Sequence, residues 1–134
     1  MTLLVIGSIA YDSIETPTGS VKDALGGSAI HFSAASSLYV QTRIVGVVGE
    51  DFNTDDLRFL SARNADTSGI VSENGRTFRW SGRYHENMNN RDSLSTELNV
   101  FEHFHRTYPN LSRIQNTFFL QTFILNFNWM YSYK

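Results

Sequence analysis

Ala24-Leu25-Gly26-Gly27-Ser28-Ala29 joins a glycine pair to a helix start and is the most informative segment of this chain. Gly26 and Gly27 have no Cβ atom and tolerate positive φ, so a ligand can approach the main chain closely there. Ser28 is a residue type that caps helices, and the free N–H groups of a helix start attract polar ligands. The stretch therefore predicts a glycine turn and a helix start that together can bind a small polar molecule.

Segments on both sides of this stretch have the pattern of buried parallel strands. Leu3 to Ile6 is a continuous apolar run, and Arg43 to Val48 is a second buried strand. A helix is predicted between them from Ser28 to about Tyr39, and another begins at Asn53–Asp56 with a capping residue and two acids. The apolar stripe expected on the first helix is His31, Ala34, Ala35 and Leu38. The alternation of strand and helix predicts an α/β fold with a parallel sheet.

The periodicity of the sequence changes after Ser68. Asn74-Gly75 is a strong hairpin signal, and the residues after it alternate between aromatic and polar side chains. Phe78, Trp80 and Tyr84 should share one face of a strand, with Arg79, Arg83 and His85 on the other. The polar stretch from Glu86 to Ser95 predicts a loop, and residues 96–101 predict a further strand.

The order of these motifs resembles the amino-terminal part of the ribokinase-like carbohydrate kinase (PfkB) family. The resemblance rests on Val5–Ser8 followed by Asp12, on the glycine pair within residues 26–29, and on the glycine-marked strand end of residues 45–52. It continues more loosely to about Phe104.

This resemblance implies a partial ribokinase-like α/β fold, with a parallel sheet, flanking helices and a β lid within residues 77–101. Residues 1–105 would form this substrate-side part of the domain. Relatives transfer the γ-phosphoryl group of ATP, usually with Mg²⁺, to a hydroxyl of a sugar or nucleoside, which the lid covers. The chain would thus be a fragment of an ATP-dependent sugar or nucleoside kinase.

The family's second signature is a Gly-Ala-Gly-Asp turn in the carboxy-terminal half, which carries the catalytic base and an anion hole. It has no match here. We therefore predict no catalytic residue in this chain, and we expect it to be inactive alone and to bind ATP and Mg²⁺ poorly. Residues 106–134 diverge as an apolar tail, which we interpret as a truncation or a change of reading frame. Residues 117–125 are apolar enough to enter the sheet as a strand.

The predicted substrate-binding residues are Asp12, Gly26, Gly27, His31 and Gly49. Asp12 follows the first strand at its carboxyl end, where open α/β sheets bind ligands. A carboxylate there can accept hydrogen bonds from two neighbouring hydroxyls, as on a sugar, although a solvated turn aspartate is the alternative. The resemblance places Gly49 near the cleft, whereas Glu50 and Asp51 beside it are more typical of helix-capping acids.

His31 stands where the family often has asparagine, and Asn53 stands where it often has glycine. Two interpretations of His31 stay open: a buried core histidine, or a hydrogen-bond donor to the substrate in place of a carboxamide. The other histidines, His85, His103 and His105, have no spacing that fixes a metal site, so we predict none.

The composition bounds the remaining possibilities. With 134 residues, 41% hydrophobic and 18% charged, the chain fits one globular domain with a modest core. A net charge of −2 offers no basic surface to nucleic acid, and the absence of cysteine excludes disulfides. The apolar start lacks the basic residues of a signal peptide, and the tail is too short and interrupted for a membrane span. We therefore expect a cytoplasmic protein with neither nucleic-acid nor membrane partners.

A function of another class also fits the sequence, namely a non-catalytic module that binds a small molecule or dimerises through the lid. Strands 77–85 and 96–101 would leave an open edge, and such an edge can pair with a second copy to give a homodimer. Sedimentation beside calorimetry with sugars and nucleosides would separate these alternatives.

Overall fold

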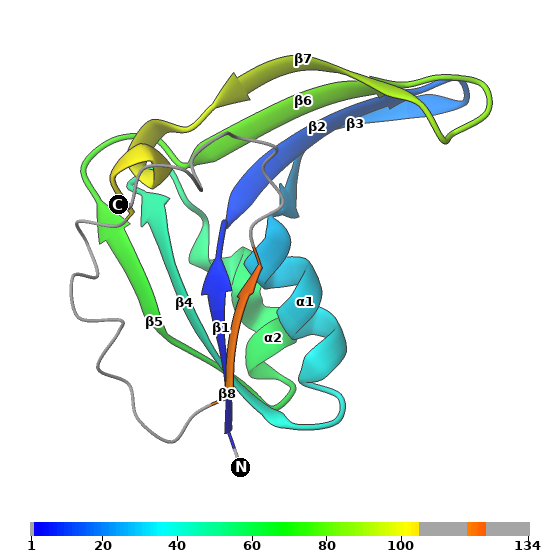
Figure 1. The fold of residues 1–134 in the computed structure, drawn as a ribbon. Coiled ribbons are helices and arrows are strands. Elements are labelled where there is room, and N and C mark those ends of the chain that lie inside the picture. Colours follow the sequence, from blue (N-terminus) through cyan, green and yellow to red (C-terminus); the bar gives the residue numbers. More distant parts are fainter. Residues whose placement is uncertain (1, 105–117, 123–134) are drawn as a thin grey trace, which may run out of the picture.

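The computed structural model describes residues 2–104 and 118–122, which form two β-sheets with helices packed against one of them (Figure 1). Within these residues the main sheet has the order β5-β4-β1-β8, and every neighbouring pair is parallel. Its strands are β1 (Thr2–Gly7), β4 (Gln41–Gly49), β5 (Ala65–Glu73) and β8 (Phe118–Thr122). The α/β class with a parallel sheet, predicted from the sequence, is confirmed.

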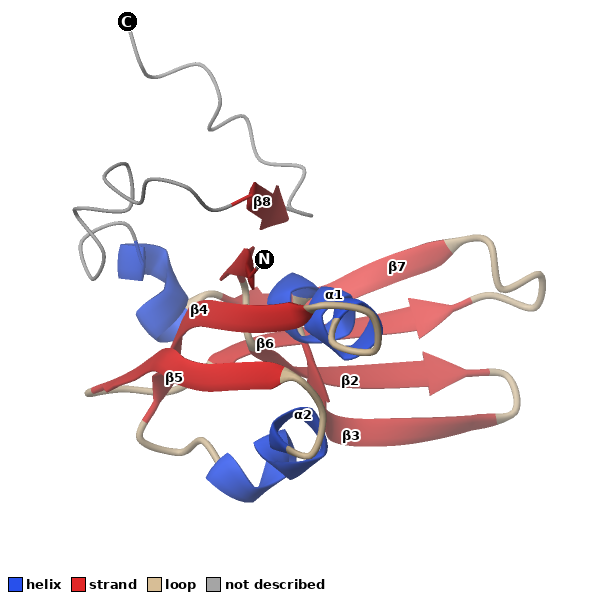
Figure 2. Cartoon of the chain, turned by 90° about the horizontal axis from the view of Figure 1, so that it is seen from below, coloured by secondary structure: helices blue, strands red, loops and turns tan. Residues whose placement is uncertain are grey.

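The second sheet, which we call the lid sheet, projects beyond the ends of β1 and β4 (Figure 1). Figure 2 shows its strands side by side in the order β3-β2-β6-β7. They are β2 (Ala10–Thr16), β3 (Gly19–Gly26), β6 (Phe78–Tyr84) and β7 (Arg91–Glu97). The β2–β6 pair is parallel, and the β2–β3 and β6–β7 pairs are antiparallel.

Two apolar clusters form the core, one on each face of the main sheet. The helices α1 (Ser28–Ser36), η1 (Thr54–Leu57) and α2 (Arg58–Ser61) cover one face, where Ile30 and Leu60 pack against Val5 and Ile44. The other face carries η2 (Asn99–His103) and the base of the lid sheet. Its cluster includes Leu4, Ile6, Val47, Phe78 and Phe101. Continuous apolar strands are expected where both faces of a parallel sheet are covered.

The lid strands differ from the prediction in two places. Asn74-Gly75 does not make a hairpin, because β5 and β6 belong to different sheets and residues 74–77 carry the chain from one sheet to the other. The second lid strand is β7, which begins within the predicted loop and overlaps the predicted strand of residues 96–101 only at residues 96–97. Val100, predicted to lie on a strand, is buried in η2 because the chain turns back onto the main sheet there.

The first helix is shorter than predicted and buries a different face. It ends at Ser36, and its buried residues are Ala29, Ile30 and Ser33, whereas His31 and Leu38 are exposed. Most of its side chains are small, so its buried and exposed faces differ little in hydrophobicity and the sequence does not distinguish them. In the tail, the predicted strand is confirmed for Phe118–Thr122, which pairs with β1, and residues 123–125 lie outside the described residues.

Candidate functional site

The structure brings Asp12 together with the glycine pair. Asp12 lies in β2 of the lid sheet, the strand that follows β1, opposite Ala24. Its side chain shares a sheet face with Gly26, where a Cβ atom would collide with the carboxylate. The carboxylate accepts a hydrogen bond from the backbone N–H of Gly27. Glycine at position 26 is therefore required by the carboxylate itself.

Asp12 is partly buried, and this burial raises the pKa of its carboxyl above the ordinary value of 3.8. The nearby His31 imidazole and the Gly27 N–H oppose that rise. Because His31 is exposed, the interpretation as a buried core histidine is wrong. His31 stands one turn into α1, close enough to act electrostatically on Asp12.

The start of α1 is held by a reciprocal pair of serines. The Ser28 N–H donates to Oγ of Ser8 at 3.0 Å, and the Ser8 N–H donates to Oγ of Ser28 at 3.3 Å. The N-cap position is Gly27, with φ of 95°, so the prediction that Ser28 caps the helix is wrong. The Ala29 N–H donates to the Ser8 carbonyl at 3.1 Å. Since these two N–H groups have partners within the protein, the helix start offers a ligand fewer donors than the sequence suggested.

Gly49 lies apart from this arrangement, at the end of β4. A Cβ atom there would collide with the backbone of residues 75–77, and the Gly49 N–H donates to Oγ1 of Thr77 at 3.0 Å. The crossing of the chain into the lid sheet thus accounts for glycine at this position without a ligand.

Asp51 has a different role from the helix cap that the sequence favoured. Its Oδ1 accepts hydrogen bonds from the backbone N–H and from Oγ1 of Thr77, both at 2.7 Å, and its Oδ2 lies 2.8 Å from Nη2 of Arg79. The cap is Asn53, whose side chain accepts from the Asp55 N–H at 3.1 Å. Sequence reasoning missed these contacts between Asp51 and the lid.

The lid face that carries Asp12 also carries Trp80, its partner in register. The predicted sharing of one face by Phe78, Trp80 and Tyr84 is consistent with the strand register. The edge of the Trp80 indole crosses Gly82, and its Nε1–H donates to Oγ of Ser93 at 3.3 Å. A carboxylate and an apolar aromatic surface therefore lie side by side on the inner face of the lid.

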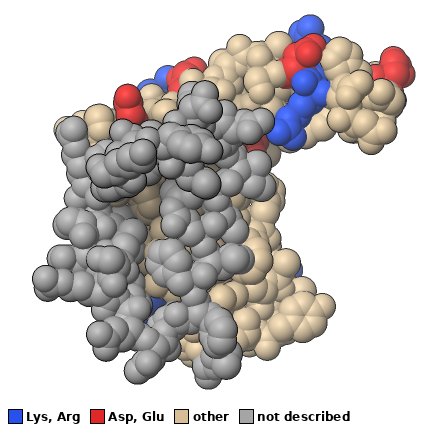
Figure 3. Space-filling view, viewed as in Figure 1, with Lys and Arg blue, Asp and Glu red and all other residues tan. Residues whose placement is uncertain are grey.

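The three side chains predicted for the polar face of the lid strand, Arg79, Arg83 and His85, each have a carboxylate partner. Arg79 contacts Asp23 and Asp51, Arg83 lies 2.7 Å from Glu15, and His85 lies 3.1 Å from Asp92. Figure 3 shows Lys or Arg side chains next to Asp or Glu side chains on the lid. The pairs neutralise one another, so this face is not a row of free cations for an anionic substrate.

Among residues 2–104 and 118–122, no group of three or more His, Cys, Asp or Glu side chains is placed to hold a metal ion. His105 of the histidine set lies outside the described residues. None of the helices in this part of the chain is long and apolar enough to cross a membrane.

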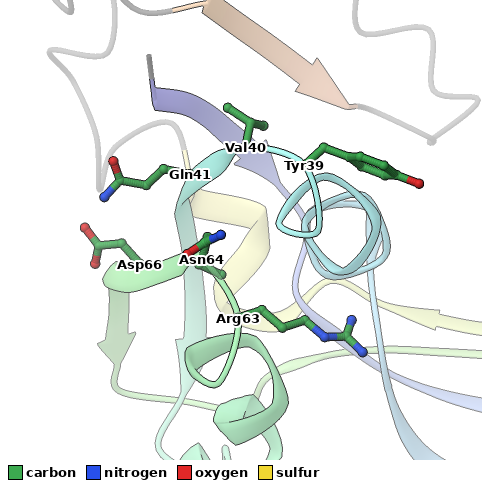
Figure 4. Close-up of a pocket in the computed structure, with 7 residues that line it drawn as sticks. Tyr39, Val40, Gln41, Arg63, Asn64 and Asp66 are labelled. Carbon is green, nitrogen blue, oxygen red and sulfur yellow. The ribbon is translucent and has the colours of Figure 1, made fainter.

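A cavity of about 460 Å³ lies at the opposite end of the main sheet (Figure 4). It is bordered by the connection into β4, at Tyr39–Gln41, and by the connection into β5, at Arg63–Asp66. The cavity contains none of the predicted substrate-binding residues. The candidate site is instead the group of residues around Asp12, which His31 influences electrostatically and which shares a lid face with Trp80.

No family model and no curated protein matches this chain. Its fold, however, is that of the amino-terminal part of ribokinase-family nucleoside and sugar kinases, as comparison with solved structures shows.

A nucleoside kinase from Burkholderia thailandensis, solved with inosine, matches with a TM-score of 0.71 and 18% identity over 87% of this chain and 42% of its own. A nucleoside kinase of the ribokinase family from Methanocaldococcus jannaschii matches with a TM-score of 0.60 and 20% identity over 78% of this chain and 39% of its own. A putative ribokinase II from E. coli, solved with ATP and Mg²⁺, matches with a TM-score of 0.57 and 20% identity over 72% of this chain and 33% of its own. The chain thus spans between a third and about two fifths of these kinases.

Proposed function

We propose that this chain is the substrate-binding part of an ATP-dependent sugar or nucleoside kinase. The observation that carries the proposal is the contact between Asp12 and the Gly26-Gly27 turn beneath the lid. A carboxylate held by one backbone N–H keeps acceptor capacity for the hydroxyls of a sugar ring. Trp80 on the same lid face supplies an apolar surface, and exposed His31 supplies a donor.

The proposed role of this chain is binding, with the phosphoryl transfer itself carried out by residues that it does not contain. Phosphoryl transfer requires a base for the hydroxyl proton and stabilisation of the transferring group. In the family these come from the Gly-Ala-Gly-Asp turn, which has no match here, and ATP with Mg²⁺ would supply the phosphoryl group. We therefore expect no turnover from this chain alone. Robust ADP release that Asp12→Ala abolishes would contradict this expectation.

Calorimetry with inosine, adenosine and D-ribose tests the proposed binding. The unmodified chain should bind at least one of these probes, and Asp12→Asn should weaken that binding by about tenfold or more, the worth of a charge-assisted hydrogen bond. Glu15→Gln is the matched control, because Glu15 lies on the same strand but pairs with Arg83 on the other face. Equal loss of affinity in both variants, or no binding of any probe by the unmodified chain, would contradict the proposal.

A second candidate function is assembly through the lid into a homodimer. The observation that favours it is β7, an edge strand of the described lid sheet in which every residue is exposed. Exposed edges can pair with a second copy. Sedimentation would then show a dimer, and Leu94→Lys, at an exposed apolar residue of β7, would shift it toward monomer.

A further inference from the structure

The lid sheet is joined to the main sheet by short connections. Ser8-Ile9 links β1 to β2, Gly27 links β3 to α1, and residues 74–77 link β5 to β6. A projecting sheet on short connections can tilt unless side chains on its base tie it to the rest of the molecule. Phe78, on the Asp12 face, packs in the apolar cluster of the main sheet. The polar side chains that tie the lid lie on the other face.

Asp51 is the centre of one such tie. It lies after β4, and both oxygens of its carboxylate contact the beginning of the lid strand β6 through Thr77 and Arg79. Thr77 is fully buried, and its Oγ1 also accepts the Gly49 N–H at 3.0 Å, while its carbonyl accepts from Nδ2 of Asn99 at 3.0 Å. The carboxylate therefore joins the end of a main-sheet strand to the first residues of a lid strand.

Arg79 extends this tie across the lid. Its side chain is 18% exposed, it lies between Asp23 of β3 and Asp51, and its Cζ stands 5.1 Å from the centre of the Tyr11 ring. Such a position over an aromatic face is favourable for a guanidinium. Arg79 thus contacts two strands of the lid and the main-sheet loop at once.

Tyr11 connects the same face to the 52–56 segment. Its hydroxyl donates to Oδ2 of Asp56 at 2.9 Å and accepts the Asn53 N–H at 3.0 Å, and its ring stacks on Phe52 with centres 5.5 Å apart. Together with Asp51 and Arg79, these contacts cover the outer base of the lid.

The arrangement bears directly on the candidate site. Tyr11 precedes Asp12 in β2, and Arg79 precedes Trp80 in β6, so the anchored and the site residues alternate along the same two strands. We propose that Asp51 is a positioning residue: through Thr77 and Arg79 it fixes the angle of the lid and thereby the distance of Asp12 and Trp80 from a bound substrate. The effect on substrate rests on the proposed function; the effect on the lid angle does not.

The test measures the lid angle directly. The chain has no cysteine. Ser20→Cys, at an exposed position of β3, and Ala35→Cys, at an exposed position of α1, therefore introduce two labelling sites for electron–electron distance measurements. Asp51→Asn removes the ion pair between lid and main sheet. Asp23→Asn is the matched control. It also removes a carboxylate that contacts Arg79, but Asp23 lies in the lid strand β3 and does not join the lid to the main sheet.

The distance distribution should broaden or shift in Asp51→Asn and stay unchanged in Asp23→Asn. Arg79→Gln keeps the Asp51–Thr77 contacts and should therefore give a smaller broadening. It is the variant to measure if Asp51→Asn fails to fold. An unchanged distribution in both Asp51→Asn and Arg79→Gln, or equal broadening in Asp23→Asn, would overturn the proposal.

Inosine affinity, measured on the same variants, separates the two proposals. It should fall by about tenfold in Asp51→Asn and little in Asp23→Asn. If the lid distance changes but the unmodified chain binds no probe, the proposed function fails and the anchoring role stands. If affinity falls while the distance distribution is unchanged, Asp51 acts otherwise than through the lid angle and this inference fails.

Discussion

The carboxylate of Asp12 occupies the space that any side chain at position 26 would need, so the identities of Asp12 and Gly26 are coupled. These residues lie on adjacent antiparallel strands of the lid, close to the start of α1. The glycine that the sequence suggested as room for a ligand is first of all room for a carboxylate.

The first prediction follows from this coupling. Gly26→Ala should displace the Asp12 carboxylate, lower the urea midpoint of unfolding and weaken binding of any sugar or nucleoside that the site accepts. Gly19→Ala is the control, because a Cβ atom at Gly19 meets nothing within 4 Å. Unaltered stability and binding in Gly26→Ala would show that the carboxylate can move away without loss.

The second prediction concerns the charge of Asp12 itself. Burial raises its carboxyl pKa, so the folded state binds the proton more tightly than the unfolded state, and the charged form costs folding free energy at neutral pH. Asp12→Asn should therefore raise the free energy of unfolding at pH 7 even as it weakens substrate binding. The stability gain should shrink as the pH falls through the folded pKa, where the unmodified carboxyl is already neutral. A lower urea midpoint for Asp12→Asn at pH 7 would contradict this account.

Much of the main sheet could be predicted because its signals are local. Leu3 to Ile6 is a continuous apolar run that forms a buried strand, and Asn53 caps a helical segment, as predicted. Each of these features is decided by residues within a few positions of one another. The lid strand β7 lacked such a signal, since every residue in it is exposed and no alternation of apolar residues marks it.

The contacts of Asp51 could not be read from the sequence because they join distant segments. Asp51 and Thr77 are 26 residues apart, and Asp51 and Arg79 are 28 apart. The turn signal of Asn74-Gly75 failed for a related reason: local turn chemistry bends the chain, but sheet pairing decides which strand follows. Here β6 pairs with β2 and β7, so the bend leads into the lid.

The third prediction is a loss of stability in acid. Hydrogen bonds from Ser68 and the neighbouring Arg43 hold the pKa of Asp66 at about 2. Burial alone would raise the pKa of Asp51, but Thr77 and Arg79 hold it below 3.8. Because both folded pKa values are depressed, their contribution is complete above about pH 4 and is lost as the pH falls toward 2.

Urea unfolding between pH 5 and pH 2 measures this loss. Asp66→Asn should make the stability fall less steeply over that interval, although the exposed Arg43 pair keeps the effect modest. An identical slope in Asp66→Asn and in the unmodified chain would contradict the assignment.

The last prediction concerns two serines of α1. Ser33 is fully buried and its hydroxyl has no hydrogen-bond partner, whereas Oγ of Ser36 lies 3.1 Å from Oγ1 of Thr42. The Ser33 hydroxyl loses its hydrogen bonds to water on folding and gains none within the protein. Ser33→Ala removes this cost, so the free energy of unfolding should rise by about 1 kcal/mol.

Ser36→Ala is the control, since it is the same substitution in the same helix, at its last residue. It also leaves the buried Thr42 hydroxyl without that contact, so Ser36→Ala should be less stable than Ser33→Ala by about 1 kcal/mol. Chemical denaturation of both variants measures the difference. A Ser33→Ala variant less stable than Ser36→Ala would contradict this prediction. The Ser33 hydroxyl would then stabilise the packing of α1 on the main sheet by more than its missing hydrogen bond costs.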